Sequence, residues 1–192
     1  VSIQDFINKY MTSSFDKGGL GFDATIAGSV VGTYWFLMLI GRMIGAAVGA
    51  KVSSKAMLTF VSSLGIILVL AAIFTPIGLQ ASMPVFRSDI SFGLNTIPMS
   101  IVFLVLCGLC TSVMWGGIFN LAVEGLGKYT ESASGFFMVM VCGGGILPLI
   151  QGYFADWLGY INSYWVIVVA LVFLLYYALA GYRNVNKDIP VT

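Results

Sequence analysis

The stretch SYWVIVVALVFLLYYALAGY, residues Ser163–Tyr182, decides the fold of this chain. It contains no charged side chain over roughly the 20 residues that a helix needs to cross the hydrocarbon core of a bilayer. Working from this run toward the N-terminus, we find further apolar runs that reach or approach this length, at Thr25–Ala50, Met57–Thr75, Ile97–Leu121 and Ser134–Trp157. The sequence therefore predicts an all-α membrane protein with five complete transmembrane helices.

The composition of the chain supports the membrane class. Of its 192 residues, 59% are hydrophobic and 9% are charged, whereas soluble domains carry roughly 25% charged residues. The mean hydropathy is +0.98, and a soluble core could not absorb this much apolar surface. The net charge of +1 gives no electrostatic basis for binding nucleic acid.

The first residues, Val1–Met11 (VSIQDFINKYM), resemble the last turns of a sixth helix whose beginning is missing. The chain begins with valine, and its start lacks the basic, apolar and small-residue pattern of a signal sequence. We therefore expect residues 1–192 to be one transmembrane bundle from a longer polypeptide, with no linker and no soluble domain.

Charged residues at the joints between the runs predict which side of the membrane each joint occupies. One set of helix ends is mainly basic, with Arg42, Lys51, Lys55, Lys128, Arg183 and Lys187 against Glu124, Glu131 and Asp188. The other is mainly acidic, with Asp5, Asp16, Asp23, Asp89 and Asp156 against Lys9, Lys17 and Arg87. Because cytoplasmic joints favour Lys and Arg, we expect Lys51–Ala56, Ala122–Ala133 and the C-terminus inside. The long joint Pro76–Thr96 then lies outside.

Glycine and proline mark two further features of the runs. In the first run, small residues recur at four-residue spacing, at Gly28 and Gly32 and again at Gly41, Gly45 and Gly49, a pattern that favours close helix packing. In the fourth run, three consecutive glycines and a proline interrupt the backbone hydrogen bonds at membrane depth. Interrupted helices of this kind are frequent where a transporter bends or lines a substrate path. The residues Gly143, Gly144, Gly145 and Pro148 therefore predict a gate, with a purely structural kink as the alternative.

Polar and aromatic side chains inside the runs indicate a cavity, because they are costly in lipid. Gln4 and Asn8 are four residues apart and share one helical face, although the neighbouring Asp5 could equally be a solvated acid. Amides suit sugar hydroxyls because they both donate and accept hydrogen bonds, and aromatic rings suit the apolar faces of sugars. The predicted substrate-binding residues are Gln4, Asn8, Tyr34, Trp115 and Asn120.

The remaining candidate residues favour structural roles. Arg42 and Glu124 are predicted structural charges, which could pair with each other or lie at the inner interface. The three cysteines fall in apolar runs, and the chain has no histidine, so we expect no metal site and no cofactor. The sequence offers no catalytic triad, no phosphate-binding glycine loop and no paired carboxylates within one run, so we do not expect an enzyme.

Three strings in order along the chain carry a family resemblance. They are GRMIG (Gly41–Gly45), IFNLAVEGLGKYT (Ile118–Thr130) and GGGILPLIQGYFAD (Gly143–Asp156). Together they resemble the C-terminal half of the fucose:proton symporter family of the major facilitator superfamily, which includes bacterial glucose/galactose transporters. The resemblance covers essentially the whole chain, and the N-terminal segment is similar to the seventh helix of that family.

The resemblance implies a twelve-helix transporter of two six-helix bundles in the bacterial inner membrane. It would carry a hexose or deoxyhexose (fucose, glucose or galactose) by alternating access, driven by protons. Trp115 corresponds to an aromatic residue, commonly Tyr, that faces the sugar, and Gln4 and Asn8 fall on the cavity-facing stretch. Asp5 departs from the small residue usual there. The proton-coupling acids of the family belong to the N-terminal bundle, which this chain lacks.

Two other functions stay open from the sequence. The chain could belong to a sugar sensor or structural membrane subunit that has the transporter fold but moves no solute. It could also belong to a transporter of a non-sugar solute, for which Arg42 would be the intramembrane cation that binds an anionic substrate.

Overall fold

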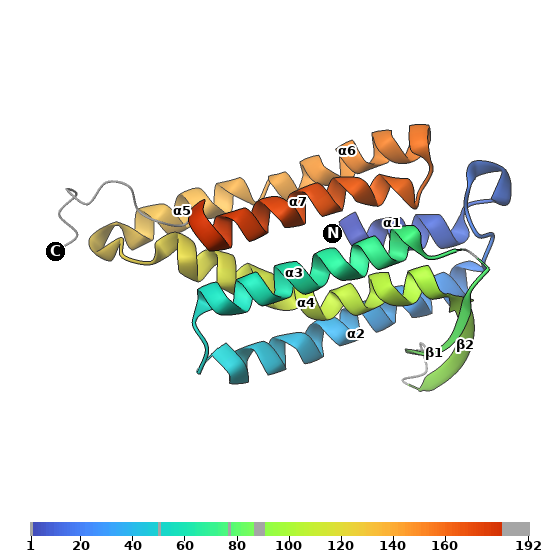
Figure 1. The fold of residues 1–192 in the computed structure, drawn as a ribbon, viewed down its shortest axis with the longest axis horizontal. Helices are drawn as coiled ribbons and strands as arrows, with labels where there is room; N and C mark the ends of the chain where they lie inside the picture. The colour runs from blue at the N-terminus through green and yellow to red at the C-terminus, as the bar shows by residue number, and fades with distance from the viewer. Residues whose placement is uncertain (1, 50, 77, 87–90, 182–192) are drawn as a thin grey trace.

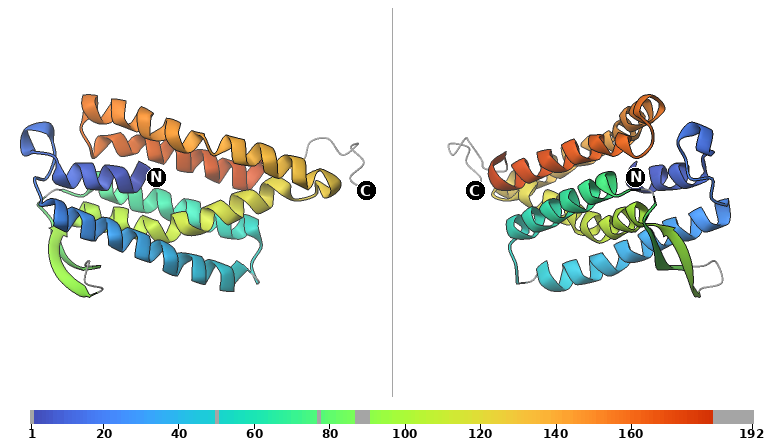
Figure 2. Two further views of the ribbon diagram at one scale, coloured as in Figure 1. Left: turned by 180° about the vertical axis from the view of Figure 1, so that it is seen from behind. Right: turned by 45° about the vertical axis from the view of Figure 1, so that its right-hand side comes forward.

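The computed structural model describes residues 2–49, 51–76, 78–86 and 91–181. Within this part of the chain, long helices lie side by side along one axis, and a two-stranded hairpin projects sideways from one end of the bundle (Figures 1 and 2). The helices are α1 (Ser2–Thr12), α2 (Ala24–Gly49), α3 (Ser54–Phe74), α4 (Met99–Val123), α5 (Thr130–Met140), α6 (Gly143–Leu158) and α7 (Trp165–Tyr176). Shorter turns are η1 (Phe15–Lys17), η2 (Gly127–Tyr129), η3 (Asn162–Tyr164) and the π-helical turn η4 (Tyr177–Gly181).

Several residues used in the sequence analysis lie outside the described residues. They are the expected boundaries Val1, Ala50 and Tyr182, and the charged residues Arg87, Asp89, Arg183, Lys187 and Asp188.

Five segments of the described chain are long and apolar enough to cross a membrane. They are Ala24–Gly49, Ser54–Phe74, Met99–Val123, Gly127–Leu158 and Asn162–Gly181. The expectation of a multi-pass integral membrane protein is confirmed. Successive joints lie at opposite ends of the bundle, so that the α2–α3 and α4–α5 joints share one end (Figure 1). This arrangement matches the alternation on which the charge argument depends.

The N-terminal end of α2 is held by the acid that precedes it. The Asp23 carboxylate Oδ2 accepts a hydrogen bond from the backbone N–H of Thr25 at 2.9 Å, and the Asp23 carbonyl accepts one from Ala27 at 3.1 Å. Such a residue satisfies amides that have no partner within the helix. The hydrogen bonds from Thr25, chiefly that of its side chain, lower the pKa of the Asp23 carboxyl. A solvated carboxylate therefore marks where α2 leaves the water.

Small residues allow α2 and α4 to pack closely. A Cβ placed on Gly41 would overlap the Ser112 hydroxyl and lie 2.9 Å from the Leu109 carbonyl oxygen, and one on Gly45 would lie 2.8 Å from Val113 Cγ2. On the facing helix, a Cβ on Gly108 would lie 2.9 Å from the carbonyl oxygen of Tyr34. These glycines hold the two backbones near each other, as expected where lipid supplies no hydrophobic force between helices.

The fourth expected span is divided into two helices. α5 ends at Met140 and α6 begins at Gly143, with Cys142 N–H donating to the Val139 carbonyl at 3.2 Å in a tighter turn. Pro148 lies within α6 and has no N–H for the Gly144 carbonyl four residues earlier. The break therefore precedes the glycines, which form the first turn of α6, and the proline removes one backbone hydrogen bond from that helix.

The joint between α3 and α4 forms a β-hairpin that the sequence analysis did not anticipate. Strands β1 (Gln80–Phe86) and β2 (Phe92–Pro98) pair antiparallel, with Phe86 opposite Phe92 and Gln80 opposite Pro98. The helical class holds for the spans, and the hairpin is an addition to it. Tertiary packing explains the hairpin better than local sequence does, because Val85 and Ile97 are fully buried against the helices.

We predict that Gly41→Ala destabilises the bundle, since the added methyl group has no room against Ser112 and Leu109. Overpacking of this kind costs about 1–3 kcal/mol. Thermal denaturation of the purified protein in detergent would measure the loss. Gly28→Ala is the matched control on the same helix, because nothing lies within 4 Å of its added Cβ. Equal melting temperatures for the two variants would contradict the close packing of α2 on α4.

Candidate functional site

The exposed aromatic surface of the bundle interior lies between α4 and α5. The Trp115 side chain is 47% exposed, and its ring lies 5.2 Å from that of Phe137, centroid to centroid. The Phe119 ring approaches the same Phe137 ring edge-on at 5.4 Å. We call Trp115, Phe119 and Phe137 the aromatic cluster. It presents a flat apolar surface that a solute could reach, which is what the sequence predicted for Trp115.

Tyr34 occupies a different environment from the one expected of a ligand contact. Its side chain is 1% exposed and packs against α4 beside Gly108. Its hydroxyl and the Thr111 Oγ1 are hydrogen-bonded at 3.0 Å. Thr111 and Gly108 lie one and two helical turns before Trp115 on the same side of α4, so Tyr34 packs further along the helix that carries the aromatic cluster and supports it. The hydroxyl that the sequence analysis assigned to a substrate is used in helix packing.

On the short helix α1, the Asn8 side chain is exposed and the Gln4 side chain is partly buried. The helix is fastened to the α6–α7 joint, where the Tyr164 hydroxyl donates to the Ile3 carbonyl at 3.1 Å and the Ser13 hydroxyl donates to the Tyr160 oxygen at 2.9 Å. Within the described residues, the Oε1 atom of Gln4 is buried and has no hydrogen-bond partner. An acceptor of this kind is costly unless water or a ligand donates to it.

Gln151 on α6 is a functional candidate that the sequence analysis missed. Its side chain is fully buried, its Nε2 donates to the Ser163 hydroxyl at a long 3.4 Å, and its Oε1 has no partner among the described residues. The signal was present, since this amide lies within the apolar run LPLIQGYF. The glycines and proline of this run indicated a backbone break, and the sequence analysis assigned no role to its one amide.

Asn120 lies apart from Trp115. The separation of five positions amounts to about 140° around α4, so the two side chains lie on different faces. The Asn120 Nδ2 donates to the Ser54 hydroxyl at 3.4 Å. Asn120 also borders two cavities near the inner ends of the helices, one of about 290 Å³ that Arg42 lines and one of about 490 Å³ that Glu124 lines. Asn120 therefore lies away from the face of α4 that carries the aromatic cluster.

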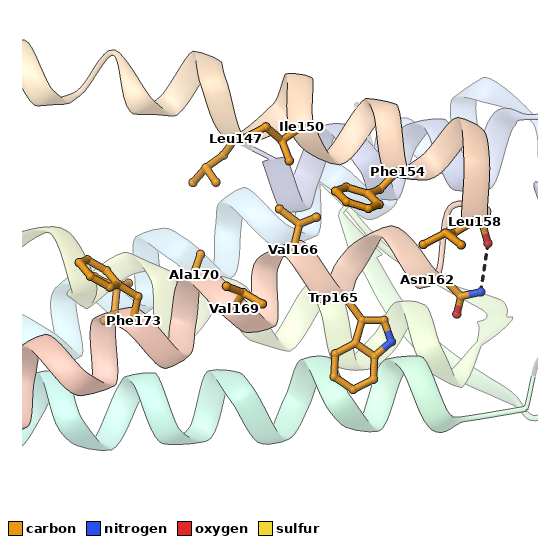
Figure 3. A pocket seen from close by; sticks show the side chains of 11 residues that line it. Leu147, Ile150, Phe154, Leu158, Asn162, Trp165, Val166, Val169, Ala170 and Phe173 are labelled. Carbon is orange, nitrogen blue, oxygen red and sulfur yellow. Dashed lines mark hydrogen bonds between the residues drawn. The ribbon is translucent and has the colours of Figure 1, made fainter.

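A cavity of about 830 Å³ forms a groove between α6 and α7 (Figure 3). Figure 3 shows Leu147, Ile150 and Phe154 directed from α6 toward α7. Near one end, the Asn162 amide already donates to the Leu158 carbonyl at 3.0 Å. A sugar needs several hydrogen-bonding partners, and this groove is lined almost entirely by hydrocarbon. Its chemistry does not match that of a sugar site.

Comparison with known proteins connects this geometry to transporters. The chain is 28% identical over 184 residues to the glucose/galactose transporter of Brucella abortus, a match that covers 96% of this chain and 39% of that protein. It is 29% identical over 183 residues to a putative glucose/galactose transporter of Helicobacter pylori, covering 93% and 40%. A shorter match, 29% over 86 residues, covers 45% of this chain and 19% of the L-fucose-proton symporter of Escherichia coli. No protein-family model matches the chain.

Solved structures show the same architecture. A peptide transporter POT in complex with sulfate superposes with a TM-score of 0.72 at 15% identity, covering 94% of this chain and 34% of that one. A POT family transporter in complex with a thioalcohol-conjugated peptide gives 0.68 at 18% identity, covering 97% and 36%. The chain shares the fold of these transporters over nearly its whole length. The expected fold class and the resemblance to sugar transporters are both confirmed. The chain spans about two fifths of the length of the curated relatives it matches.

Proposed function

We propose that this chain is the C-terminal half of a secondary transporter that carries a hexose or deoxyhexose across the bacterial inner membrane by alternating access. The observation that carries the proposal is the similarity, over 96% of the chain, to a bacterial protein named as a glucose/galactose transporter. The named relatives are transporters and not enzymes, and we propose no catalytic role for this chain.

The proposed sugar site combines the aromatic cluster with amides from α1. Trp115 offers the flat surface on which the C–H face of a sugar ring stacks, while Gln4 and Asn8 supply donors and acceptors for its hydroxyls. α1 contacts both α4 and α6, which supports a site shared by these helices. The unpartnered Oε1 of Gln4 is suited to accept a hydrogen bond from a sugar hydroxyl. Tyr34 supports the helix that carries Trp115, and Asn120, on a different face of α4, is left out of the proposed site.

The remaining parts of the proposed mechanism involve charge and bending. We assign Arg42 and Glu124 to structural roles at the inner ends of the helices, where each lines a polar cavity. The break before Gly143, Gly144 and Gly145, together with Pro148, is the proposed hinge of the divided span. Protons are the proposed coupling ion, and the acids that bind them are proposed to belong to an N-terminal bundle of the same polypeptide. No other cofactor is proposed.

The proposed function predicts sugar uptake driven by a proton gradient. Full-length protein in liposomes should accumulate labelled glucose, galactose or fucose faster when the outside is more acidic than the inside. A protonophore should abolish the difference, which controls for passive leak. Absence of gradient-stimulated uptake for all three sugars would contradict the proposal. Binding without any flux would instead indicate the sensor.

We predict that Trp115→Ala weakens sugar binding, because the half-exposed indole is the largest apolar contact offered to the ring. The loss should be about 1–3 kcal/mol, which corresponds to about a 5- to 150-fold rise in Kd measured by titration calorimetry on the full-length protein. Trp165→Ala on α7 removes a similarly exposed indole and should leave Kd unchanged. Tyr34→Phe should also leave it unchanged, since the lost hydroxyl bonds Thr111. An unaltered Kd for Trp115→Ala would remove this residue from the site.

A further inference from the structure

The hairpin reaches down the side of α2 and does not end above it. The backbone N–H of Phe86 donates to the Thr33 hydroxyl at 2.8 Å, and the Phe86 ring stacks on that of Phe36 at 5.6 Å with the planes 5° apart. Phe92 on the opposite strand meets the same Phe36 ring edge-on at 5.5 Å. A Cβ on Gly32 would lie 3.7 Å from the Phe86 carbonyl oxygen, so this glycine lets the strand approach.

These contacts place strand backbone within the depth of the hydrocarbon. Thr33 follows the first residue of α2 by nine positions, which is about 13 Å along the helix at 1.5 Å per residue. α2 has 26 residues, or about 39 Å of helix, and the hydrocarbon core is about 30 Å thick. With α2 centred in the bilayer, the amide of Phe86 lies about 9 Å below the outer hydrocarbon boundary.

Strand backbone at this depth has polar groups to satisfy. In an antiparallel pair, alternate residues direct both N–H and C=O away from the partner strand. The Phe86 N–H donates to Thr33, away from β2, so Phe86 and its partner Phe92 form a pair that is not hydrogen-bonded across the strands. The backbone N–H and C=O of Phe92 therefore point away from β1. Those of Leu94 and Thr96, two and four residues further along β2, point the same way. Toward α2, the backbone N–H of Phe86 in β1 is satisfied by Thr33, and Pro84 at the same phase has no N–H to satisfy. On the β2 side, no described residue supplies a backbone partner.

Lipid cannot cover such an edge, since an open sheet edge is not tolerated against hydrocarbon and irregular backbone persists only beside protein or water. We propose that the hairpin forms part of the wall of the water-filled cleft through which the solute reaches the site from outside. The β2 edge, Phe92 to Thr96, then faces the cleft. The proposal rests on the proposed transporter function for what the cleft carries. Its physical basis, a strand edge at membrane depth for which the described residues supply no backbone partner, is independent of which solute moves.

Two measurements on the full-length protein test the proposal. Both use a background with Cys107, Cys110 and Cys142 replaced by alanine. The double variant Phe36→Cys/Phe86→Cys, treated in membranes with a short bifunctional thiol reagent, should crosslink, which establishes that the hairpin lies at the depth of α2.

The second measurement is the labelling rate of Phe92→Cys, and of Leu94→Cys as an alternative, with a charged membrane-impermeant methanethiosulfonate added outside. Val172→Cys is the control at matched depth, because Val172 is seven residues into α7, about 10 Å, and half exposed. A crosslink together with labelling at least tenfold faster than Val172→Cys supports the proposal. No crosslink, or hairpin labelling within tenfold of Val172→Cys for both variants, overturns it. Neither measurement uses a sugar, so failure of sugar uptake would leave this result unaffected.

Discussion

The fold depends on one constraint. Helices in lipid must satisfy their backbone hydrogen bonds internally, and they must associate through packing contacts because lipid supplies no hydrophobic force between them. Here the association centres on α4. Gly41 and Gly45 of α2 and Gly108 of α4 bring these two helices so close that an added Cβ would have almost no space. Large side chains at these positions would separate α2 from α4 and move Tyr34 away from Thr111. The helix that carries Trp115 is therefore held in place by its close packing against α2 at these glycines.

The same constraint explains where polar atoms gather. Hydroxyls at membrane depth mostly bond carbonyls or each other, as with Tyr164 to Ile3. Within the described chain, the buried polar atoms that lack a partner are Oε1 of Gln4 and Gln151 and the hydroxyls of Tyr10, Ser62 and Ser100. The two amides lie on α1 and α6, which contact each other. Each unpartnered acceptor is expensive to bury and is therefore a candidate for binding water or solute.

Hydropathy alone predicted the membrane class and the helical spans, because a run of apolar residues as long as the bilayer is thick has few alternatives. Side-chain direction was harder to predict. Tyr34 and Trp115 look alike in sequence, yet only the approach of Gly108 on another helix shows that Tyr34 is enclosed. Asn120 was grouped with Trp115 from proximity in sequence, although they occupy different faces of α4. The hairpin could not be predicted from local sequence because contacts with α2, distant in sequence, stabilise it. The burial of Gln151 depends on the packing of α6 against other helices, which the glycines and proline around it do not indicate.

The central claim is that these helices cross the bilayer alternately as a single bundle, and topology measured in sealed vesicles tests it most directly. Single cysteines at Val52 and Gly125, in the α2–α3 and α4–α5 joints, should react with an impermeant thiol reagent from the cytoplasmic side only. Cysteines at Ser14 and Ser82 should react from the opposite side only. If Val52 and Gly125 were instead labelled from different sides, the bundle described here would be wrong.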